Sequence, residues 1–374
     1  MIMSSPLSYE AFRATQRFPA LDGFRGLCAL LVVTAHMTER GVTWDWLSGG
    51  FGVTGFFVLS GYLITTLCLR EEEDRGGVGL QAFYIRRSFR IFPSYFVMLA
   101  LYCAVTLLLS RERWPFLAHA LPYYLLYCNE FAPPAPFYQS WSLGMEEKYY
   151  LIWPVLAFVM CRGRPVLRIG IAAALLILAE TVGRLPLLPD YCHPLWKYDA
   201  ILIGCLLAMG LNSRRGFMML VNLARPLPAK CLLLAMLGLH LGLSHATFLK
   251  PIYPFIVAGF LTSLILGDLP WGRHFGGRLG TYLGRRSYGI YLTHTLVIAP
   301  IERILSPVGP WWQWNKVLGM LTAIAVSIGL AEVLYRLIEA PLIRIGHAWS
   351  DLLQSRRTGS DRRRAPMPLA HQPI

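Results

Sequence analysis

Residues Leu21–Met37 read LDGFRGLCALLVVTAHM, and the centre of this run is apolar enough for a membrane-spanning helix. The same run carries three ionisable side chains, Asp22, Arg25 and His36. Ionisable groups are costly in lipid, so they indicate either a polar contact between helices or a functional path inside a helical bundle. Choosing between these two interpretations requires the rest of the chain.

Apolar runs of this kind recur along most of the 374 residues, and short polar breaks separate them. The chain is 55% hydrophobic and only 15% charged, which is typical of a polytopic membrane protein. No cleavage site of small residues follows the first run, so we expect it to be a span and not a signal peptide. The sequence predicts an all-α integral membrane protein with about ten transmembrane helices, over residues 19–38, 51–69, 91–110, 148–161, 169–183, 197–211, 230–243, 251–267, 287–302 and 317–338.

The segment 114–130, WPFLAHALPYYLLYCNE, fits this series less well. It has prolines at both ends of its apolar part and aromatic residues throughout, which favours an interfacial or re-entrant segment. An eleventh span is the alternative.

The distribution of Lys and Arg between alternate loops predicts the orientation. With the N-terminus in the cytoplasm, 25 of these residues fall on the inside and eight on the outside. We therefore expect N-in, C-in topology, with a cytoplasmic segment 1–17, a membrane domain 18–345 and a basic, disordered cytoplasmic tail 346–374 that touches anionic lipid. The net charge of +14 follows from this topology and implies no nucleic-acid partner.

The eight cysteines are scattered, mostly within apolar runs, and their spacing suggests neither a disulfide framework nor a zinc site. Cys28 is most simply a small core residue. No glycine-rich phosphate loop and no tandem repeat is visible. We expect no metal cofactor.

Helical geometry places the three ionisable residues of the first run on one face. At 100° per residue, His36 lies about 20° from the direction of Arg25, and Asp22 lies within about 60° of it. The rise of the helix separates Arg25 from His36 by about 16 Å. This face carries Asp22, Arg25, Ala29, Val32 and His36, whereas the lipid-type residues on other faces are Leu27, Leu30, Leu31 and Val33.

Three ionisable groups in one row favour a functional path over a simple helix–helix contact. Gly23 and Gly26 permit close approach of another backbone or a ligand near the cytoplasmic end. The geometry alone leaves both proton transport and acyl transfer open.

Other segments bring polar groups to membrane depth. Ser60 lies in the glycine-rich run 49–65. Arg86, Arg87 and Arg90 lie at the cytoplasmic entrance of the third expected span, where Arg86 and Arg90 are i,i+4 neighbours able to clamp a phosphate or a carboxylate. The positive-inside rule explains the same arginines without a ligand.

Two later segments also combine apolar and ionisable residues. Glu146 and Glu147 are expected at the start of a helix. Stabilisation by the helix dipole is one explanation for them. The other is functional: one of the two carboxylates tunes a histidine or binds a sugar hydroxyl. Tyr288, Tyr291 and His294 lie within the ninth expected span, and a satisfied buried histidine is the simpler interpretation of His294.

Together these segments resemble the membrane acyltransferase-3 family. Arg25 and His36 in LDGFRGLCALLVVTAH match its first-helix signature. The segments GFFVLSGYLIT, FYIRRSFRIFPSY, SWSLGMEEKYYLIWP, SYGIYLTH and YRLIEAPL follow in the family's order, so the resemblance spans roughly residues 18–345. It implies a ten-helix membrane fold that moves acetyl or other short acyl groups from cytoplasmic acyl-coenzyme A to hydroxyls of envelope or exported glycans and of some small molecules.

The resemblance also suggests roles for individual residues. The family's essential pair falls on Arg25 and His36, and its motif glutamate on Glu146 or Glu147. We expect catalysis to use His36, Arg25, Glu146 and Glu147, and the acyl-coenzyme A donor to be held by Asp22, Arg25, Arg86, Arg87 and Arg90. For the glycan or glycolipid acceptor we expect contacts from Ser60, Trp141, Ser142, Tyr291 and His294.

The sequence departs from the family at three positions. Lys148 stands where glutamine is common, and Thr293 and Thr295 replace tryptophans that are common beside the histidine. Some relatives carry a soluble esterase-like domain after the membrane part, whereas only about thirty residues follow Pro341 here, so we expect a stand-alone transferase.

The expected mechanism uses His36 as general base on an acceptor hydroxyl, because the pKa of histidine lies near neutrality. An acyl-histidine intermediate is the rival mechanism. Other function classes that remain are a proton-coupled sugar transporter or flippase, an acyltransferase of small glycosides and a non-catalytic binding protein. Outer tryptophans suit sugar stacking or an interfacial belt in a bacterial inner membrane, namely Trp44, Trp46, Trp141, Trp311 and Trp312.

Overall fold

The computed structural model describes residues 6–39, 51–182, 197–242, 251–304 and 312–357. Within these ranges the regular structure is helical and includes no strand. The α-helices are α1 (Tyr9–Ala14), α2 (Pro19–Glu39), α3 (Phe51–Arg75), α4 (Leu80–Leu109), α5 (Trp114–Leu125), α6 (Trp141–Pro154), α7 (Pro165–Thr181), α8 (Tyr198–Asn212), α9 (Arg214–Leu220), α10 (Pro226–Gly242), α11 (Tyr253–Leu266), α12 (Pro270–Phe275), α13 (Arg278–Ile304), α14 (Trp312–Leu334) and α15 (Ala340–Arg357).

The fold confirms an all-helical membrane protein, and each of the ten apolar runs coincides with a helix. Among the described residues, four helices are long and apolar enough to cross a bilayer: Pro19–Met37, Phe51–Arg75, Leu80–Leu109 and the continuous stretch Lys316–Gln354. A fifth is added if Arg214–Ala224 and Pro226–His240, which meet at 76°, form one broken span. The remaining helices are shorter or more polar, so the count of ten stays a prediction.

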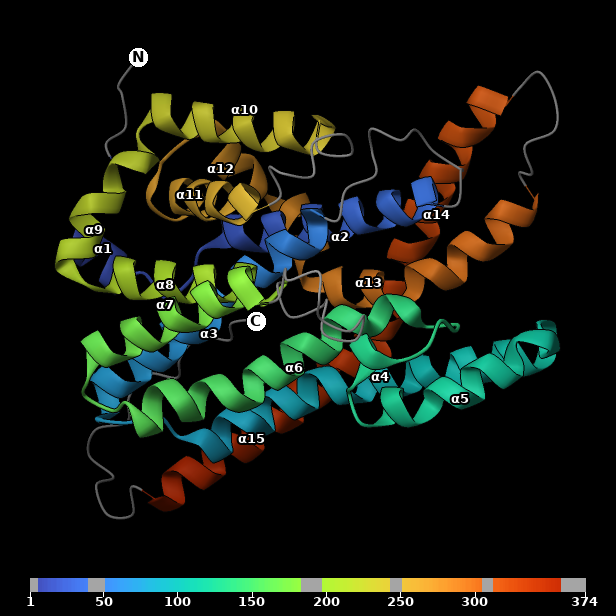
Figure 1. Ribbon diagram of the computed structural model, residues 1–374, viewed down its shortest axis with the longest axis horizontal. Coiled ribbons are helices and arrows are strands. Elements are labelled where there is room, and N and C mark those ends of the chain that lie inside the picture. Colours follow the sequence, from blue (N-terminus) through green and yellow to red (C-terminus); the bar gives the residue numbers. More distant parts are fainter. Residues whose placement is uncertain (1–5, 40–50, 183–196, 243–250, 305–311, 358–374) are drawn as a thin grey trace.

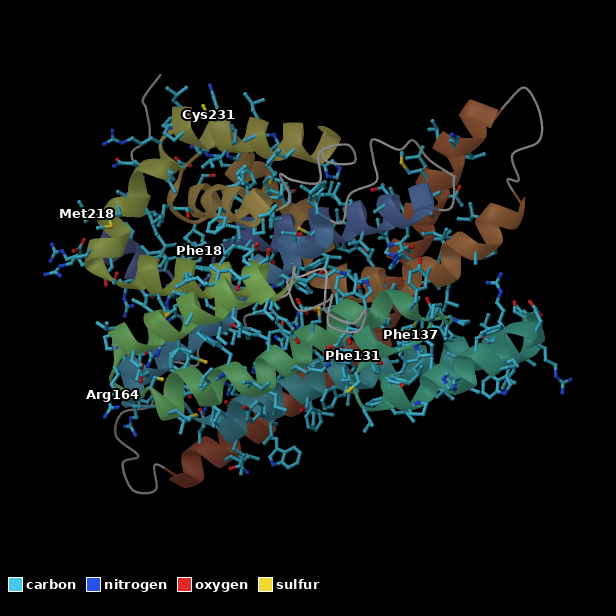
Figure 2. The ribbon with its side chains drawn as sticks, in the orientation of Figure 1. Phe18, Phe131, Phe137, Arg164, Met218 and Cys231 are labelled. Atoms are coloured by element: carbon cyan, nitrogen blue, oxygen red, sulfur yellow. The ribbon has the colours of Figure 1, made fainter. Side chains whose placement is uncertain are left out.

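Most of the helices run roughly along the long axis of the molecule (Figure 1). Phe18 and Arg164 lie toward one end, and Phe131 and Phe137 lie toward the other (Figure 2). Segments expected on opposite sides of the membrane therefore lie apart along the helix direction. The orientation of the molecule in a membrane remains a prediction.

The segment 114–130, which fitted the series of expected spans less well, contains the short helix α5, which packs beside α4 (Figure 1). Its 12 residues rise only about 18 Å, whereas a bilayer core is about 30 Å thick. The length favours the interfacial or re-entrant interpretation over an eleventh span.

Helix α2 lies at the centre of the bundle and packs on α13, α3, α12, α11 and α14. Its closest neighbour is α13, which runs in the same direction, and glycines permit the approach. A Cβ at Gly284 would lie 2.0 Å from the carbonyl oxygen of Asp22, and a Cβ at Gly23 would lie 2.0 Å from that of Phe275. The expectation that Gly23 admits another backbone is therefore confirmed.

The expected lipid-facing side of α2 needs a correction. Leu27, Leu30 and Leu31 are partly exposed, but Val33 is fully buried against α13 and α14. The helix is enclosed on more faces than the sequence suggested, because helices from distant parts of the chain surround it. Cys28 is 2% exposed and lies against Gly52 and Gly55 of α3, as expected of a small core residue.

The C-terminal region also differs from expectation. The predicted tail begins at residue 346, but α15 continues unbroken to Arg357 and packs along α4 (Figure 1). Phe89 of α4 meets the ring of Trp349 and lies against Gly346. Residues 358–374 lie outside the described ranges, so the expected disorder there is not addressed.

Candidate functional site

Five helices line a pocket with an interior volume of about 70 Å³, several times what one water molecule needs. Helices α2, α3, α4, α6 and α13 supply its walls. The lining residues are Arg25, Phe56, Ser60, Leu63, Arg87, Arg90, Ile91, Ser142, Leu143, Glu146, Glu147, Tyr150, Ser287, Tyr288 and Tyr291. Eight of the thirteen residues singled out from the sequence meet here.

The pocket gathers three arginines and two glutamates. Arg25 of α2, which is 8% exposed, lines the pocket together with Arg87 and Arg90 of α4 and with Glu146 and Glu147 of α6. The guanidinium of Arg87 stacks 3.3 Å from the centroid of the Tyr150 ring. Buried cations and carboxylates of this kind are stable only when they compensate one another or a ligand.

Glu146 and Glu147 differ in how firmly they are held. Glu146 Oε1 accepts a 2.8 Å hydrogen bond from the Ser60 hydroxyl, and that hydroxyl accepts another from Tyr150 at 2.8 Å. The chain Tyr150–Ser60–Glu146 joins α6 to α3 and fixes the direction of the Glu146 carboxylate. The geometry therefore distinguishes Glu146 as the positioned carboxylate of the pair.

Two residues expected at the donor site lie elsewhere. Asp22 pairs with Arg17 at 2.9 Å and lies 4.0 Å from Arg25, so its stronger ion pair is with Arg17. Arg86 turns away from the pocket and donates to the Ser350 hydroxyl of α15 at 3.3 Å. The arginines that share the pocket are Arg87 and Arg90, spaced i,i+3, and not the i,i+4 pair Arg86 and Arg90.

His36 does not line the pocket, and it meets a second histidine. Its ring centroid lies 4.8 Å from that of His294 of α13, and His36 Nδ1 is 3.3 Å from His294 Nε2. Both side chains are buried, with 9% and 0% exposure. The parallel course of α2 and α13 brings the two rings together.

Tyr291 connects the pocket to the histidine pair. It lines the pocket, and its carbonyl oxygen lies 2.6 Å from His294 Nδ1, one helical turn further along α13. Its hydroxyl donates to the Gln139 carbonyl and lies 2.6 Å from the Ser142 hydroxyl. Tyr291 therefore lies between the pocket, which its side chain lines, and the histidine pair, which its carbonyl contacts.

Residues beyond the histidine pair form a second polar network. Tyr102 bonds to Thr295 and accepts from Gln139 Nε2 at 2.8 Å. Thr293 instead bonds back to the Gly289 carbonyl of its own helix. The small threonine at 295, in place of the tryptophan common in the family, therefore admits a hydrogen bond to α4.

Trp141 and Lys148 also lie outside the pocket. The Trp141 ring stacks against the Lys197 ammonium, 3.6 Å from the ring centroid. Lys148 forms a 2.8 Å ion pair with Glu130 and donates to the carbonyls of Tyr127 and Gly144. Trp44, Trp46 and Trp311 lie outside the described residues, as does the side chain of Trp312.

Several residues of the site carry little signal in the sequence. Tyr150 lies one helical turn after Glu146, a spacing that could have indicated it. Tyr138, whose ring centroid lies 5.7 Å from that of His36, begins a three-residue 3-10 helix that is too short to show a periodic pattern in the sequence. Glu339, 4% exposed in the YRLIEAPL motif, interacts electrostatically with Arg90. In the part of the chain that the structure describes, no group of three or more His, Cys, Asp or Glu side chains is arranged to hold a metal ion.

The fold and the site define a polytopic membrane protein with an arginine–glutamate pocket next to a histidine pair. Residues 18–336 match the protein family described as an acyltransferase domain, Acyl_transf_3, and the chain belongs to that family. The resemblance on the quoted motifs is thereby confirmed.

Curated relatives point the same way. The chain is 29% identical to the "Putative peptidoglycan O-acetyltransferase YrhL" of Bacillus subtilis, covering 89% of this chain and 56% of that protein. It is 28% identical to the "Peptidoglycan O-acetyltransferase OatA" of Listeria monocytogenes, over 88% and 56%. A "Putative O-acetyltransferase" of Staphylococcus aureus is 32% identical over 41% and 27%. The chain spans about half the length of the first two, and no solved structure matches it.

Proposed function

We propose that this protein is a membrane O-acyltransferase that moves an acetyl or other short acyl group from acyl-coenzyme A to a hydroxyl of a cell-envelope or exported glycan. One observation carries the proposal: α2 presents Arg25 to the pocket of arginines and His36 to the histidine pair, about 16 Å apart along one helix. Family membership and the names of the relatives support acyl transfer to a glycan, with peptidoglycan as the first acceptor to test.

The arginine pocket is the proposed donor site. Coenzyme A is a polyanion, and guanidinium groups bind phosphate oxygens with paired, charge-assisted hydrogen bonds. Arg25, Arg87 and Arg90 converge there from two helices, and the buried Nε–H of Arg87 has no acceptor among the described residues. Arg87 and Arg90 hold phosphate groups, while Arg25 holds the donor nearer the thioester and Glu146 keeps the guanidiniums in place.

The histidine end is the proposed site of chemistry. His36 removes the proton from the acceptor hydroxyl as the oxygen attacks the thioester carbonyl. The new C–O bond replaces the C–S bond, and the thiolate of coenzyme A leaves and takes the proton back from the imidazolium. The products are the acyl ester and free coenzyme A, and His36 returns to its neutral state.

The acceptor site is proposed on the polar walls between the pocket and the histidines. Ser142 and Tyr291 offer hydroxyl groups there, and Ser60 lies on the donor side. In the proposed orientation the arginines face the cytoplasm of a bacterium and the glycan approaches from the outer face of the inner membrane. The rival acyl-histidine mechanism predicts a label on His36 after rapid quenching with labelled donor, and direct transfer predicts none.

The test is donor turnover by the purified full-length protein in lipid nanodiscs. With labelled acetyl-coenzyme A and peptidoglycan fragments, we expect release of coenzyme A and ester-linked label on the glycan. His36→Ala should lower the rates of both by at least about 100-fold, whereas His119→Ala, at an exposed position of α5, should retain them. Transport of the glycan without any coenzyme A release would overturn the proposal in favour of a transporter.

A further inference from the structure

The hydrogen bonds of the histidine pair determine which nitrogen of each ring carries the proton. A neutral imidazole has one N–H donor and one nitrogen lone pair, whereas a backbone carbonyl oxygen only accepts. His294 Nδ1 lies 2.6 Å from the carbonyl oxygen of Tyr291. Two acceptors at that distance would repel, so Nδ1 of His294 carries the proton and Nε2 has the lone pair.

The same reasoning applies to His36. Its Nδ1 lies 3.0 Å from the carbonyl oxygen of Val32, so Nδ1 carries the proton here too. That N–H also points to His294 Nε2 at 3.3 Å, which is an acceptor by the preceding argument. Each assignment agrees with the other, and together they leave the lone pair of a neutral His36 on Nε2.

We propose that His294 is a positioning residue for His36: its Nε2 accepts the His36 Nδ1–H, which fixes the ring across α2 and α13 and keeps Nε2 of His36 as the base. The hydrogen bond to Val32 lies within α2 and cannot orient the ring relative to α13. When His36 takes a proton on Nε2, the imidazolium strengthens the bond to His294, because hydrogen bonds from charged donors are stronger than neutral ones. The catalytic part of this inference rests on the proposed function.

This assignment gives His294 a role different from the acceptor contact expected from the sequence. A histidine that bound the glycan would act independently of His36. A histidine that acts through His36 depends on it, so removal of His294 should cost little more once His36 is already absent.

A double-mutant cycle tests that prediction in the purified full-length protein. We expect His294→Leu to lower kcat by about 30-fold with little change in the KM for acetyl-coenzyme A, since the donor pocket lies apart. His294→Gln, whose amide oxygen can accept from Nδ1, should recover most of that loss. In the His36→Ala background, His294→Leu should lower the residual rate less than twofold. A further 30-fold loss there, or no difference between the leucine and glutamine variants, would overturn the proposal.

A spectroscopic measurement tests the tautomer without any activity. Selective ¹⁵N-histidine labelling, with His36→Gln used to assign its signal among the nine histidines, should show neutral His36 as the Nδ1–H form. In His294→Gln this form should persist, and in His294→Leu the signal should broaden or shift. A predominant Nε2–H form in the wild-type protein would refute the proposal even if transfer is observed. A confirmed Nδ1–H form without any transfer would instead refute the proposed function alone.

Discussion

Arg25 and His36, toward the two ends of α2, are buried to the same degree but have different chemical surroundings. Arg25 faces two more arginines and two glutamates, while His36 faces a second histidine, the ring of Tyr138 and a backbone carbonyl. A charged end suits a polyanionic ligand, and an uncharged end suits a general base such as histidine. In the proposed mechanism, one helix thereby separates donor binding from proton transfer.

Replacement of His36, the proposed base, should lower the rate of acyl transfer the most. His36→Ala is expected to lower kcat by about 10²- to 10⁴-fold, the range that a general base contributes, with a nearly unchanged KM for acetyl-coenzyme A. Steady-state release of coenzyme A measures both constants. An unchanged kcat would remove His36 from the chemistry.

Replacement of a pocket arginine should have the next largest effect, a higher KM for acetyl-coenzyme A. Arg87→Gln and Arg90→Gln each remove a charged hydrogen-bond donor, worth about 1.5–3 kcal/mol or roughly 10- to 150-fold. Arg86→Gln should raise KM less, because Arg86 donates to Ser350 outside the pocket. Arg278→Gln, at the exposed start of α13, serves as the unchanged control. An equal effect of the Arg86 and Arg87 variants would contradict the division drawn from the structure.

A substitution that separates α2 from α13 should disturb the pocket and the histidine pair together. In Gly284→Ala the new Cβ would meet the Asp22 carbonyl, so the two helices must separate, at a cost of about 1–3 kcal/mol. A Cβ at Gly329 of α14 meets nothing within 4 Å, which makes Gly329→Ala the matched control. Thermal unfolding in detergent should show a lower transition temperature for the first variant alone. If Gly284→Ala unfolds like the wild type, the two helices are not held as described.

The smallest effect on activity is expected from Lys148, which lies outside the pocket and away from the histidine pair. Lys148→Gln removes the ion pair with Glu130 and should cost about 1 kcal/mol of stability while activity stays within about threefold. The double variant Lys148→Gln with Glu130→Gln should regain part of that stability, because no buried carboxylate is then left without its cation. A loss of activity as large as that of the arginine variants would assign Lys148 to the site.

The local sequence pattern predicted which residues share one face of α2. It could not predict the contacts of the candidate site that join residues far apart in the chain. The face shared by Arg25 and His36 follows from the period of a helix, and every expected apolar run forms one. The partnership of His36 with His294 joins residues 258 positions apart, and no local period encodes it. The same limit explains Arg86: its spacing to Arg90 is correct for one face, but only the position of α15 shows that Arg86 bonds to Ser350.

Equilibrium binding of coenzyme A to purified variants tests the separation of the two ends most directly. Isothermal titration of the full-length protein in nanodiscs should show that Arg25→Gln weakens coenzyme A binding by at least about tenfold, because a charged hydrogen-bond donor is lost. His36→Ala should bind coenzyme A as the wild type does, although it should transfer the acyl group far more slowly. Equal weakening in the two variants, or unchanged binding in Arg25→Gln, would contradict a donor site at the Arg25 end of α2.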